Sequence, residues 1–532
     1  MRANSKEVWA KYVAELFESN SPPFRSQDLS EPAPGILHSE VRKALSEIKT
    51  RKASGPDDIC PDILKLIEDE NIHILVQLFN DIYNSGYIPR DWLKSTFIPI
   101  PKKPGARKCA EFRLISLMSQ VLKVFLKIIH RRIRRKCEQD VSELQMGFRD
   151  GLGTREALFA LSVLLQKCRD QQREVYLCFI DYTKAFDCVD HTTLLELLQR
   201  KGVDAQDLKI VQNLYEQQVA SVKLENTETS IVPIGRGVRQ GCVLSPMLFN
   251  MYSEVIFQNA LDETEEGLKV NGKLVNNLRY ADDTVIIADS PEGLQRLIDS
   301  ILTSGDAMGL RINISKTKIM QISRNQNNNF NINIYGSPIE QVTKFKYLGS
   351  WICEDLNPEI EIRSRIEQAR ANFIKMRNLL TDRTLNLNIR FNFVRCYVHS
   401  TLLYGVEAWT LKVSSINKLE AFEMWVYRRM LRIPWTDHIT NQEVLHRMNK
   451  DRTILETIKK RKTAYLGHVM RQDKYRFLQL IMEGKIEGKR GPGRRQCSWL
   501  KNLRDWTGLD SNSLLRRAQD RDEFARIVAD LH

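Results

Sequence analysis

The chain has 532 residues, more than one hydrophobic core usually supports, so we expect two to four domains. Hydrophobic residues make up 42% and charged residues 27% of the sequence, and no apolar run approaches the roughly 20 residues of a membrane helix, which argues against a membrane protein. The ten cysteines include no C-x-x-C pair, which argues against the usual zinc sites and favours reduced thiols.

The charge balance indicates a polyanionic partner. The formal net charge is +14, and residues 450–505 hold 16 Lys and Arg against 6 Asp and Glu. Clustered cations release phosphate counterions on binding, so this segment favours a nucleic-acid partner over a merely solvated surface. The N-terminus lacks the apolar core of a signal peptide, and we expect a soluble protein of the nucleus and cytoplasm.

The N-terminal segment is predicted to be mainly helical. Apolar residues repeat at helical spacing over 8–17, a Ser/Pro-rich linker covers 19–35, and a second helix is expected over 38–50. The basic segment 49–65 then runs through a Gly-Pro-Asp turn into another helix. That pattern fits either a phosphate-facing entry or a plain loop.

A basic turn stands between two predicted strands, over 95–101 and 111–117. Pro99 and Pro101 have no backbone N–H to donate to a neighbouring strand, which predicts a sheet edge for the first strand. Lys102 and Arg113 on this hairpin could close over a triphosphate. A solvated basic hairpin fits the same residues equally well.

A continuous apolar run over 175–180 follows two helices that we expect over 119–136 and 154–166. Such a run is typical of a strand covered on both faces. Asp181 stands at the C-terminal end of this strand. A charged side chain at the end of a buried strand needs a partner.

A glycine-rich loop over 235–244 precedes a helix predicted to start near Ser245, with Pro246 suited to the first turn. Glycines let a backbone approach a nucleic-acid strand closely, and Arg239 and Gln240 can reach phosphates or base edges. Loops of this kind are common, so this one is weak evidence by itself.

The segment 279–288 is predicted to form two short strands that meet at Asp282 and Asp283. A hairpin of this kind exposes both acids at its tip. Alone, the pair is ordinary turn chemistry. If Asp181 comes to lie beside them, three carboxylates from two neighbouring strands form the group that two divalent metals require to activate a hydroxyl and neutralise a leaving pyrophosphate.

The order of these motifs resembles the reverse transcriptase of non-LTR (LINE-type) retrotransposons over about 53–352. The motifs are the basic hairpin, Phe-Ile-Asp-Tyr-x-Lys-Ala-Phe-Asp, Gly-Val-Arg-Gln-Gly-Cys-x-Leu-Ser-Pro and Tyr-Ala-Asp-Asp. The resemblance implies an α+β right-hand polymerase with fingers, an antiparallel palm and a helical thumb. The chain departs from the family pattern at Asp58, Leu114 and Val243, where Gly, Pro and Pro are common, but at none of the metal-binding acids.

The resemblance also implies the roles of residues at the catalytic centre. Asp181, Asp282 and Asp283 are expected to be catalytic and to bind two Mg²⁺ ions, with Mn²⁺ as an alternative. Lys316, in the next palm motif over 309–318, is a candidate for protonating the pyrophosphate. The segment 345–350 is similar to the primer grip, a hairpin that steers the primer 3′ end.

Four further residues correspond to positions at which the family binds the incoming nucleotide. Phe186 matches the steric gate, whose ring crowds a ribose 2′-hydroxyl and so favours deoxynucleotides. Arg113 corresponds to the fingers arginine that holds the triphosphate, with Lys102 as a helper. Gln240 is expected to contact the incoming nucleotide or the template.

Four domains are expected along the chain. They are an N-terminal helical extension (1–80), fingers and palm (81–354), a helical thumb (355–440) and a basic, mostly helical C-terminal extension (441–532) that ends in a helix over 513–531. In this extension Trp499 is a possible stacking platform, and the arginine-rich run is either a nucleic-acid contact or a flexible basic linker. The predicted nucleic-acid contacts are Arg239, Lys489, Arg490, Arg494 and Arg495.

The sequence thus predicts an RNA-directed DNA polymerase that uses an RNA template, a DNA primer and deoxynucleoside triphosphates, with no membrane partner. Family members usually carry an upstream endonuclease, which is not recognised here, so we expect a polymerase unit that cannot nick its own target. A catalytically inactive remnant that only binds nucleic acid is the alternative. An RNA-dependent RNA polymerase is disfavoured by Phe186.

Overall fold

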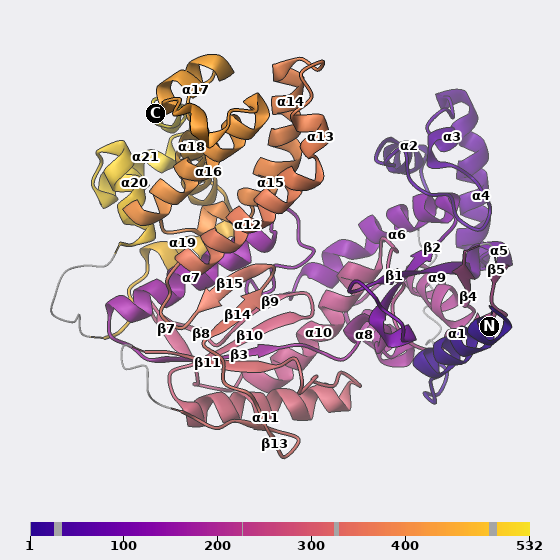
Figure 1. Ribbon diagram of the computed structural model, residues 1–532. Helices are drawn as coiled ribbons and strands as arrows, with labels where there is room; N and C mark the ends of the chain where they lie inside the picture. Colours follow the sequence, from indigo (N-terminus) through magenta and orange to yellow (C-terminus); the bar gives the residue numbers. More distant parts are fainter. Residues whose placement is uncertain (1, 26–33, 226, 324–328, 489–496, 532) are drawn as a thin grey trace. The chain divides into compact units, whose positions relative to one another are not determined.

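The computed structural model describes residues 2–25, 34–225, 227–323, 329–488 and 497–531, and these fold into two compact units (Figure 1). The first unit comprises residues 1–148, 182–264 and 299–313. The second comprises residues 149–181, 265–298 and 314–532. The chain therefore passes between the units several times, and the carboxylate Asp181 is the last residue of one second-unit segment.

A mixed sheet forms the centre of the first unit. Its strands are β1 (Lys94–Pro101), β2 (Phe112–Leu117), β4 (Val219–Leu224), β5 (Thr227–Glu228) and β6 (Val232–Pro233), in the order β2-β1-β4-β5 with β6 also paired to β4. The antiparallel β1–β2 hairpin is as predicted. The edge position is not, because β4 runs parallel to β1 along Lys94–Phe97. Pro99 and Pro101 lie beyond that pairing, where a missing N–H removes no ladder bond to β4.

Helices surround this sheet. They are α1 (Arg2–Phe17), α2 (His38–Ser46), α3 (Pro61–Leu64), α4 (Ile72–Ser85), α5 (Arg90–Leu93), α6 (Gln120–Glu138), α8 (His191–Arg200), α9 (Ala205–Glu216) and α10 (Ser245–Leu261). The predicted N-terminal helix is confirmed as α1, which packs against β4 and β6. Its apolar residues Trp9, Val13 and Phe17 share one core with Phe97 and Val222 of the sheet.

The second unit contains an antiparallel sheet in the order β11-β3-β10-β9, whose strands lie side by side in Figure 1. The strands are β3 (Val175–Ile180), β9 (Asn277–Tyr280), β10 (Asp283–Ala288) and β11 (Lys318–Ile322). Every residue of β3 is buried, as the apolar run predicts. Among the described residues of this unit, three two-stranded pairs add to the β structure: β7 (Leu268–Val270) with β8 (Lys273–Val275), β12 (Asn333–Ile334) with β13 (Ser337–Pro338), and β14 (Lys344–Tyr347) with β15 (Ser350–Cys353).

Helices make up most of the rest of the second unit. They are α7 (Thr154–Asp170), α12 (Glu359–Lys375), α13 (Arg377–Leu380), α14 (Leu387–Phe393), α15 (Ser400–Leu402), α16 (Val413–Leu431), α17 (Asn441–Met448), α18 (Ile454–Met470), α19 (Arg476–Glu483), α20 (Trp499–Thr507), α21 (Ser511–Gln519) and α22 (Arg521–Ala529). A π-helical turn, Val394–His399, joins α14 to α15. The helix α11 (Pro291–Ala307) begins in the second unit and ends in the first.

The single closing helix predicted over 513–531 is wrong. Asp520 lies between α21 and α22 in an extended conformation, with φ −84° and ψ 120°. Its side chain accepts hydrogen bonds from the backbone N–H groups of Asp522 and Glu523, so it caps a new helix where the first one ends.

Across the described ranges, no helix combines the length and the apolarity that crossing a bilayer requires.

Candidate active site

The two adjacent acids stand on a tight hairpin of the second unit. Strand β9 pairs with β10 so that Tyr280 is opposite Asp283, which leaves Ala281 and Asp282 as a two-residue connection. Ala281 adopts φ +57°, a left-handed conformation that an L-residue with a Cβ rarely takes. The predicted Asp-Asp hairpin is confirmed, with Asp282 in its connection and Asp283 at the start of β10.

The register between β3 and β10 brings Asp181 to this hairpin. Thr284 pairs with Ile180, so continuing the antiparallel register by one residue places Asp283 opposite Asp181. Side chains alternate along a strand, so Asp181 lies on the same face as Phe179. A cavity of about 310 Å³ opens there and is lined by Phe179, Ile180, Asp181, Asp283, Thr284, Lys316, Phe345, Lys346 and Tyr347.

Lys316 lines the same cavity and forms an ion pair with Asp181. Its Nζ lies 3.0 Å from Oδ2 of Asp181, and its side chain is 63% exposed. The neighbouring hydroxyl of Thr317 accepts a hydrogen bond from the backbone N–H of Asp181 at 3.4 Å. The structure therefore brings the sequence-predicted residues Lys316 and Asp181 together.

The donor chemistry of this cavity fits a hard divalent cation. Among the described residues, no three His, Cys, Asp or Glu side chains gather into a complete metal cluster, and Asp282 does not line the cavity. Mg²⁺, however, keeps several waters and commonly takes one or two protein carboxylates together with substrate phosphates. The oxygens of Asp181 and Asp283 are sufficient for a site of that kind.

The β14–β15 hairpin closes one side of the same cavity. Phe345 stacks on Phe179 with ring centroids 4.3 Å apart and 17° between planes, and the Tyr347 centroid is 5.9 Å from Phe179. Burial raises the pKa of Tyr347 far above its ordinary value, and the negative charge of Asp283 raises it further. Tyr347 is therefore a neutral phenol and a hydrogen-bond donor throughout the physiological pH range.

In the first unit, Phe186 belongs to the short 3₁₀ turn Ala185–Asp187. Its ring is half-buried and stacks on Phe249 with centroids 4.2 Å apart and 15° between planes. The edge of Phe148 contacts it from another side, at 6.1 Å between centroids. Phe186 therefore packs against two aromatic rings of the same unit.

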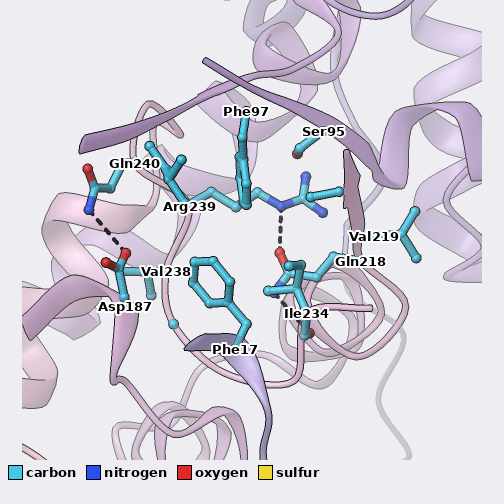
Figure 2. Close-up of a pocket in the computed structure, with 13 residues that line it drawn as sticks. Phe17, Ser95, Phe97, Asp187, Gln218, Val219, Ile234, Val238, Arg239 and Gln240 are labelled. Carbon is cyan, nitrogen blue, oxygen red and sulfur yellow. Dashed lines mark hydrogen bonds between the residues drawn. The ribbon is translucent and has the colours of Figure 1, made fainter. Parts of the chain in front are cut away.

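Gln240 and Arg239 are neighbours in the glycine-rich loop but point in opposite directions in the small pocket of Figure 2. Gln240 donates from Nε2 to Oδ1 of Asp187 at 3.1 Å. Burial raises the pKa of Asp187 to about 6, and the hydrogen bond from Gln240 partly opposes this effect. Asp187 was not among the predicted site residues, although its position directly after Phe186 was a usable signal.

Arg239 points into the protein (Figure 2). It is 5% exposed, and its guanidinium donates to Oε1 of Gln218 at 2.8 Å and to the carbonyls of Leu93 and Leu214, both at 3.2 Å. A buried guanidinium with these partners holds the loop against α5, α9 and the residue that precedes β4. The structure thus gives Arg239 a packing role in place of the predicted nucleic-acid contact.

The glycines of this loop approach protein backbone. Gly237 has φ +87°, and a Cβ added there would lie 2.8 Å from the carbonyl oxygen of Asp187. Gly241 has φ +120°, and its added Cβ would lie 2.9 Å from the carbonyl oxygen of Ser116. The loop therefore needs glycine to pack closely on the segment that carries Phe186.

The basic β1–β2 hairpin is partly neutralised by its own turn. Lys102 donates from Nζ to the carbonyl of Ala110 at 3.1 Å, and Lys103 forms a 2.7 Å ion pair with Glu111. Lys103 and the backbone N–H groups of the turn lower the pKa of Glu111 to about 2. Arg113, opposite Ile100 on the ladder, is exposed.

The predicted C-terminal contacts are in part outside the described residues, namely Lys489, Arg490, Arg494 and Arg495. Trp499, suggested as a stacking platform, is instead 2% exposed. Its indole donates to the carbonyl of Glu407 at 2.6 Å, and its ring meets Phe159 edge to face at 4.9 Å between centroids. This tryptophan is part of the core of the second unit.

The reverse transcriptase (RNA-dependent DNA polymerase) family matches residues 100–352 of the chain. The RNA-directed DNA polymerase from mobile element jockey of Drosophila melanogaster is 25% identical over 81% of this chain and 47% of its own length. The Pol polyprotein from type-1 retrotransposable element R2 of Nasonia vitripennis is 29% identical over 52% of this chain and 26% of its own length. The chain thus spans about half, or less, of these two relatives.

A transposon-derived protein of Caenorhabditis elegans is 32% identical, and the match covers 49% of this chain and 98% of that protein. Among solved structures, apo telomerase from Candida tropicalis, truncated from its C-terminal domain, aligns with 55% of this chain and 60% of that chain at 17% identity and a TM-score of 0.35. By the family match and these relatives, the chain belongs to the reverse transcriptases of non-LTR retrotransposons.

Proposed function

We propose that the protein is an RNA-directed DNA polymerase that adds deoxynucleotides to the 3′-hydroxyl of a DNA primer on an RNA template during retrotransposition. The observation that carries this proposal is the juxtaposition of Asp181 and Asp283 in one cavity, at the ends of two adjacent strands of an antiparallel sheet. Reverse transcriptases depend on divalent metal, and this cavity offers the oxygen donors that such a metal prefers.

Asp181, Asp283 and Asp282 are the residues proposed to hold two Mg²⁺ ions, for which Mn²⁺ can substitute. Bound there, the cations supply the charge that stabilises an attacking primer oxygen and a leaving pyrophosphate. Lys316 is proposed to donate a proton to the leaving group, and its Nζ lies 3.0 Å from Oδ2 of Asp181.

The residues proposed to select and hold the nucleotide belong to the first unit. Phe186, fixed by its stacking on Phe249, would crowd a ribose 2′-hydroxyl and so favour deoxynucleotides. Arg113 and Lys102 would bind the triphosphate. Gln240 would contact the nucleotide or the template with the side of its amide that is turned away from Asp187.

The expected division into fingers and palm (81–354), thumb (355–440) and flanking extensions is part of the proposal. The basic run of the C-terminal extension is proposed to bind the nucleic-acid backbone through Lys489, Arg490, Arg494 and Arg495. We also propose that the protein works in the nucleus and cytoplasm.

Primer extension by the purified full chain tests this function. The unmutated protein should extend a DNA primer on an RNA template with deoxynucleotides and Mg²⁺, and Asp181→Asn and Asp283→Asn should each lower the rate by at least about 100-fold. Asp473→Asn removes a carboxylate that is 96% exposed and should not change the rate. An unmutated protein that binds RNA in a salt-dependent way but extends no primer would support the inactive alternative.

Nucleotide choice provides a separate test of the proposed Phe186 gate. The unmutated protein should reject ribonucleotides, and Phe186→Val should admit them while deoxynucleotide addition continues. Equal use of both sugars by the unmutated protein would contradict the gate and favour an RNA-dependent RNA polymerase.

A further inference from the structure

The hydroxyl of Tyr347 is buried without a hydrogen bond. Tyr347 is 2% exposed, and within the described ranges no group donates to or accepts from its Oη. Desolvating a hydroxyl without a partner is unfavourable, and a phenylalanine at this position would keep the ring packing without that penalty. A tyrosine here is therefore better explained by what its hydroxyl does when a ligand is bound.

The position of this hydroxyl relates it to the acids. Tyr347 packs on Phe179, whose side chain lies on the same face of the sheet as Asp181 and, across the register, Asp283. Tyr347 and both acids line one cavity. The hairpin that is similar to the primer grip thus brings a neutral donor to the edge of the carboxylate pair.

We propose that Tyr347 is a positioning residue that hydrogen-bonds the Asp283 carboxylate when a divalent cation is bound, and so fixes the oxygen that faces the cation. This inference rests on the proposed metal site. Hydrogen bonds at such sites are often open in the ligand-free enzyme and close on binding. A bond from the second shell orients a ligating carboxylate and commonly contributes 10- to 100-fold in metal affinity.

The proposal also gives Asp283 and Asp282 different supports. In this proposal Asp283 is held from β10 and, through Tyr347, from the β14–β15 hairpin, whereas Asp282 belongs to the two-residue connection between β9 and β10. Movement of the β14–β15 hairpin, for example when a primer is bound, would then shift the carboxylate of Asp283 before that of Asp282.

Mn²⁺ binding to the full chain, followed by the paramagnetic resonance signal of the unbound ion, tests the proposal without requiring turnover. Tyr347→Phe should weaken Mn²⁺ binding by about 10-fold. Tyr465→Phe is the matched control, because Tyr465 is a second buried phenol of the same unit whose hydroxyl has no partner in the described part of the chain. Both variants keep the ring, so both should melt at or above the temperature of the unmutated protein.

Asp283→Asn completes the experiment. It should weaken Mn²⁺ binding by itself, and Tyr347→Phe added to it should produce no further loss, because Tyr347 acts on the cation through the carboxylate that this change removes. If Tyr347→Phe binds Mn²⁺ as tightly as the unmutated protein while Asp283→Asn does not, the metal site stands and the role of Tyr347 is refuted. If Asp283→Asn also leaves binding unchanged, the proposed metal site fails, and this inference fails with it.

Discussion

Asp187 is a half-buried carboxylate that accepts a hydrogen bond from the amide of Gln240 and so orients it. Burial raises its pKa to about 6, and the Gln240 hydrogen bond and the charges of Lys184, Lys102 and Arg236 counteract that rise only in part. The group is therefore ionised at neutral pH but protonates in mild acid. At that point the amide of Gln240 loses the anionic acceptor that fixes its orientation.

The raised pKa of Asp187 makes a prediction about stability. A carboxyl whose folded pKa is raised adds stability below its unfolded value of 3.8, and this is lost as pH rises through about 6. Between pH 4.5 and 7 the unmutated protein should therefore lose about 2 kcal/mol relative to Asp187→Asn, which keeps an acceptor for Gln240. Denaturant unfolding of both proteins at several pH values measures the difference, and parallel curves would contradict it.

At the scale of single elements, arginines of the long helix α6 pair with a glutamate of α2 and with the glutamate that follows this helix. Arg132 donates to both carboxylate oxygens of Glu40 on α2, at 3.0 and 2.7 Å, and to the carbonyls of Pro34 and Gly35, both at 2.8 Å. Arg131 reaches Glu47 at 2.6 Å. These cations connect α2 to α6, which a count of charges along the sequence does not reveal.

Replacing Arg132 should therefore be costly. Its side chain is 14% exposed, so Arg132→Ala leaves Glu40 partly buried without its partner and should lower the free energy of unfolding by about 2–4 kcal/mol. Arg132→Lys should not restore it, because an ammonium cannot make the same four contacts. Arg134→Ala, which removes an i,i+4 pair with Glu138, is the control and should change stability by about 0.5 kcal/mol or less. Similar losses in both variants would show that the Arg132 contacts are not special.

Some elements of the fold and of the candidate site can be predicted from the sequence, and others cannot. The fully apolar run before Asp181 and the strands on either side of the two acids predict β3 and the β9–β10 hairpin, because their signals are local. The burial of Arg239 and Trp499 depends on partners such as Gln218 and Glu407, which lie 21 and 92 residues away and carry no signal of their own. At Asp58 the structure explains a departure from the family pattern, since its φ of +53° suits glycine and is tolerated by Asp.

At the scale of the whole molecule, the C-terminal extension is built into the second unit. Arg461 forms a 2.5 Å ion pair with Glu407, and Lys167 of α7 donates to the carbonyls of Met482 and Gly484 at 2.6 and 2.8 Å. Part of the extension is thus packed against α7, the helix that precedes β3, which is one of the two inner strands of the antiparallel sheet. We therefore expect the extension and that sheet to unfold together, with a single free energy of unfolding.

Lys462 should make the free energy of unfolding of this unit depend on pH. Its ammonium is fully buried, donates to the carbonyl of Trp409 at 2.5 Å and to Oδ1 of Asn502 at 3.1 Å, and has the rings of Trp499 and Trp506 within 5.3 and 5.0 Å. Burial lowers its pKa to about 7, from an ordinary value of 10.5. Because the folded pKa is lowered, the unfolded chain binds more protons between these values.

Stability should therefore rise with pH between about 7 and 10.5, and be lost as pH falls through 7. From pH 7 to 9 the unmutated protein should gain about 2 kcal/mol relative to Lys462→Met, which has no proton to release. Lys460→Met removes a half-buried lysine paired with Glu456 at 2.6 Å and should run parallel to the unmutated protein. Thermal unfolding across this range, monitored by circular dichroism, measures all three. A Lys462→Met curve parallel to the unmutated one would mean that this lysine keeps its proton on folding, with its charge stabilised by the carbonyls and tryptophan rings around it.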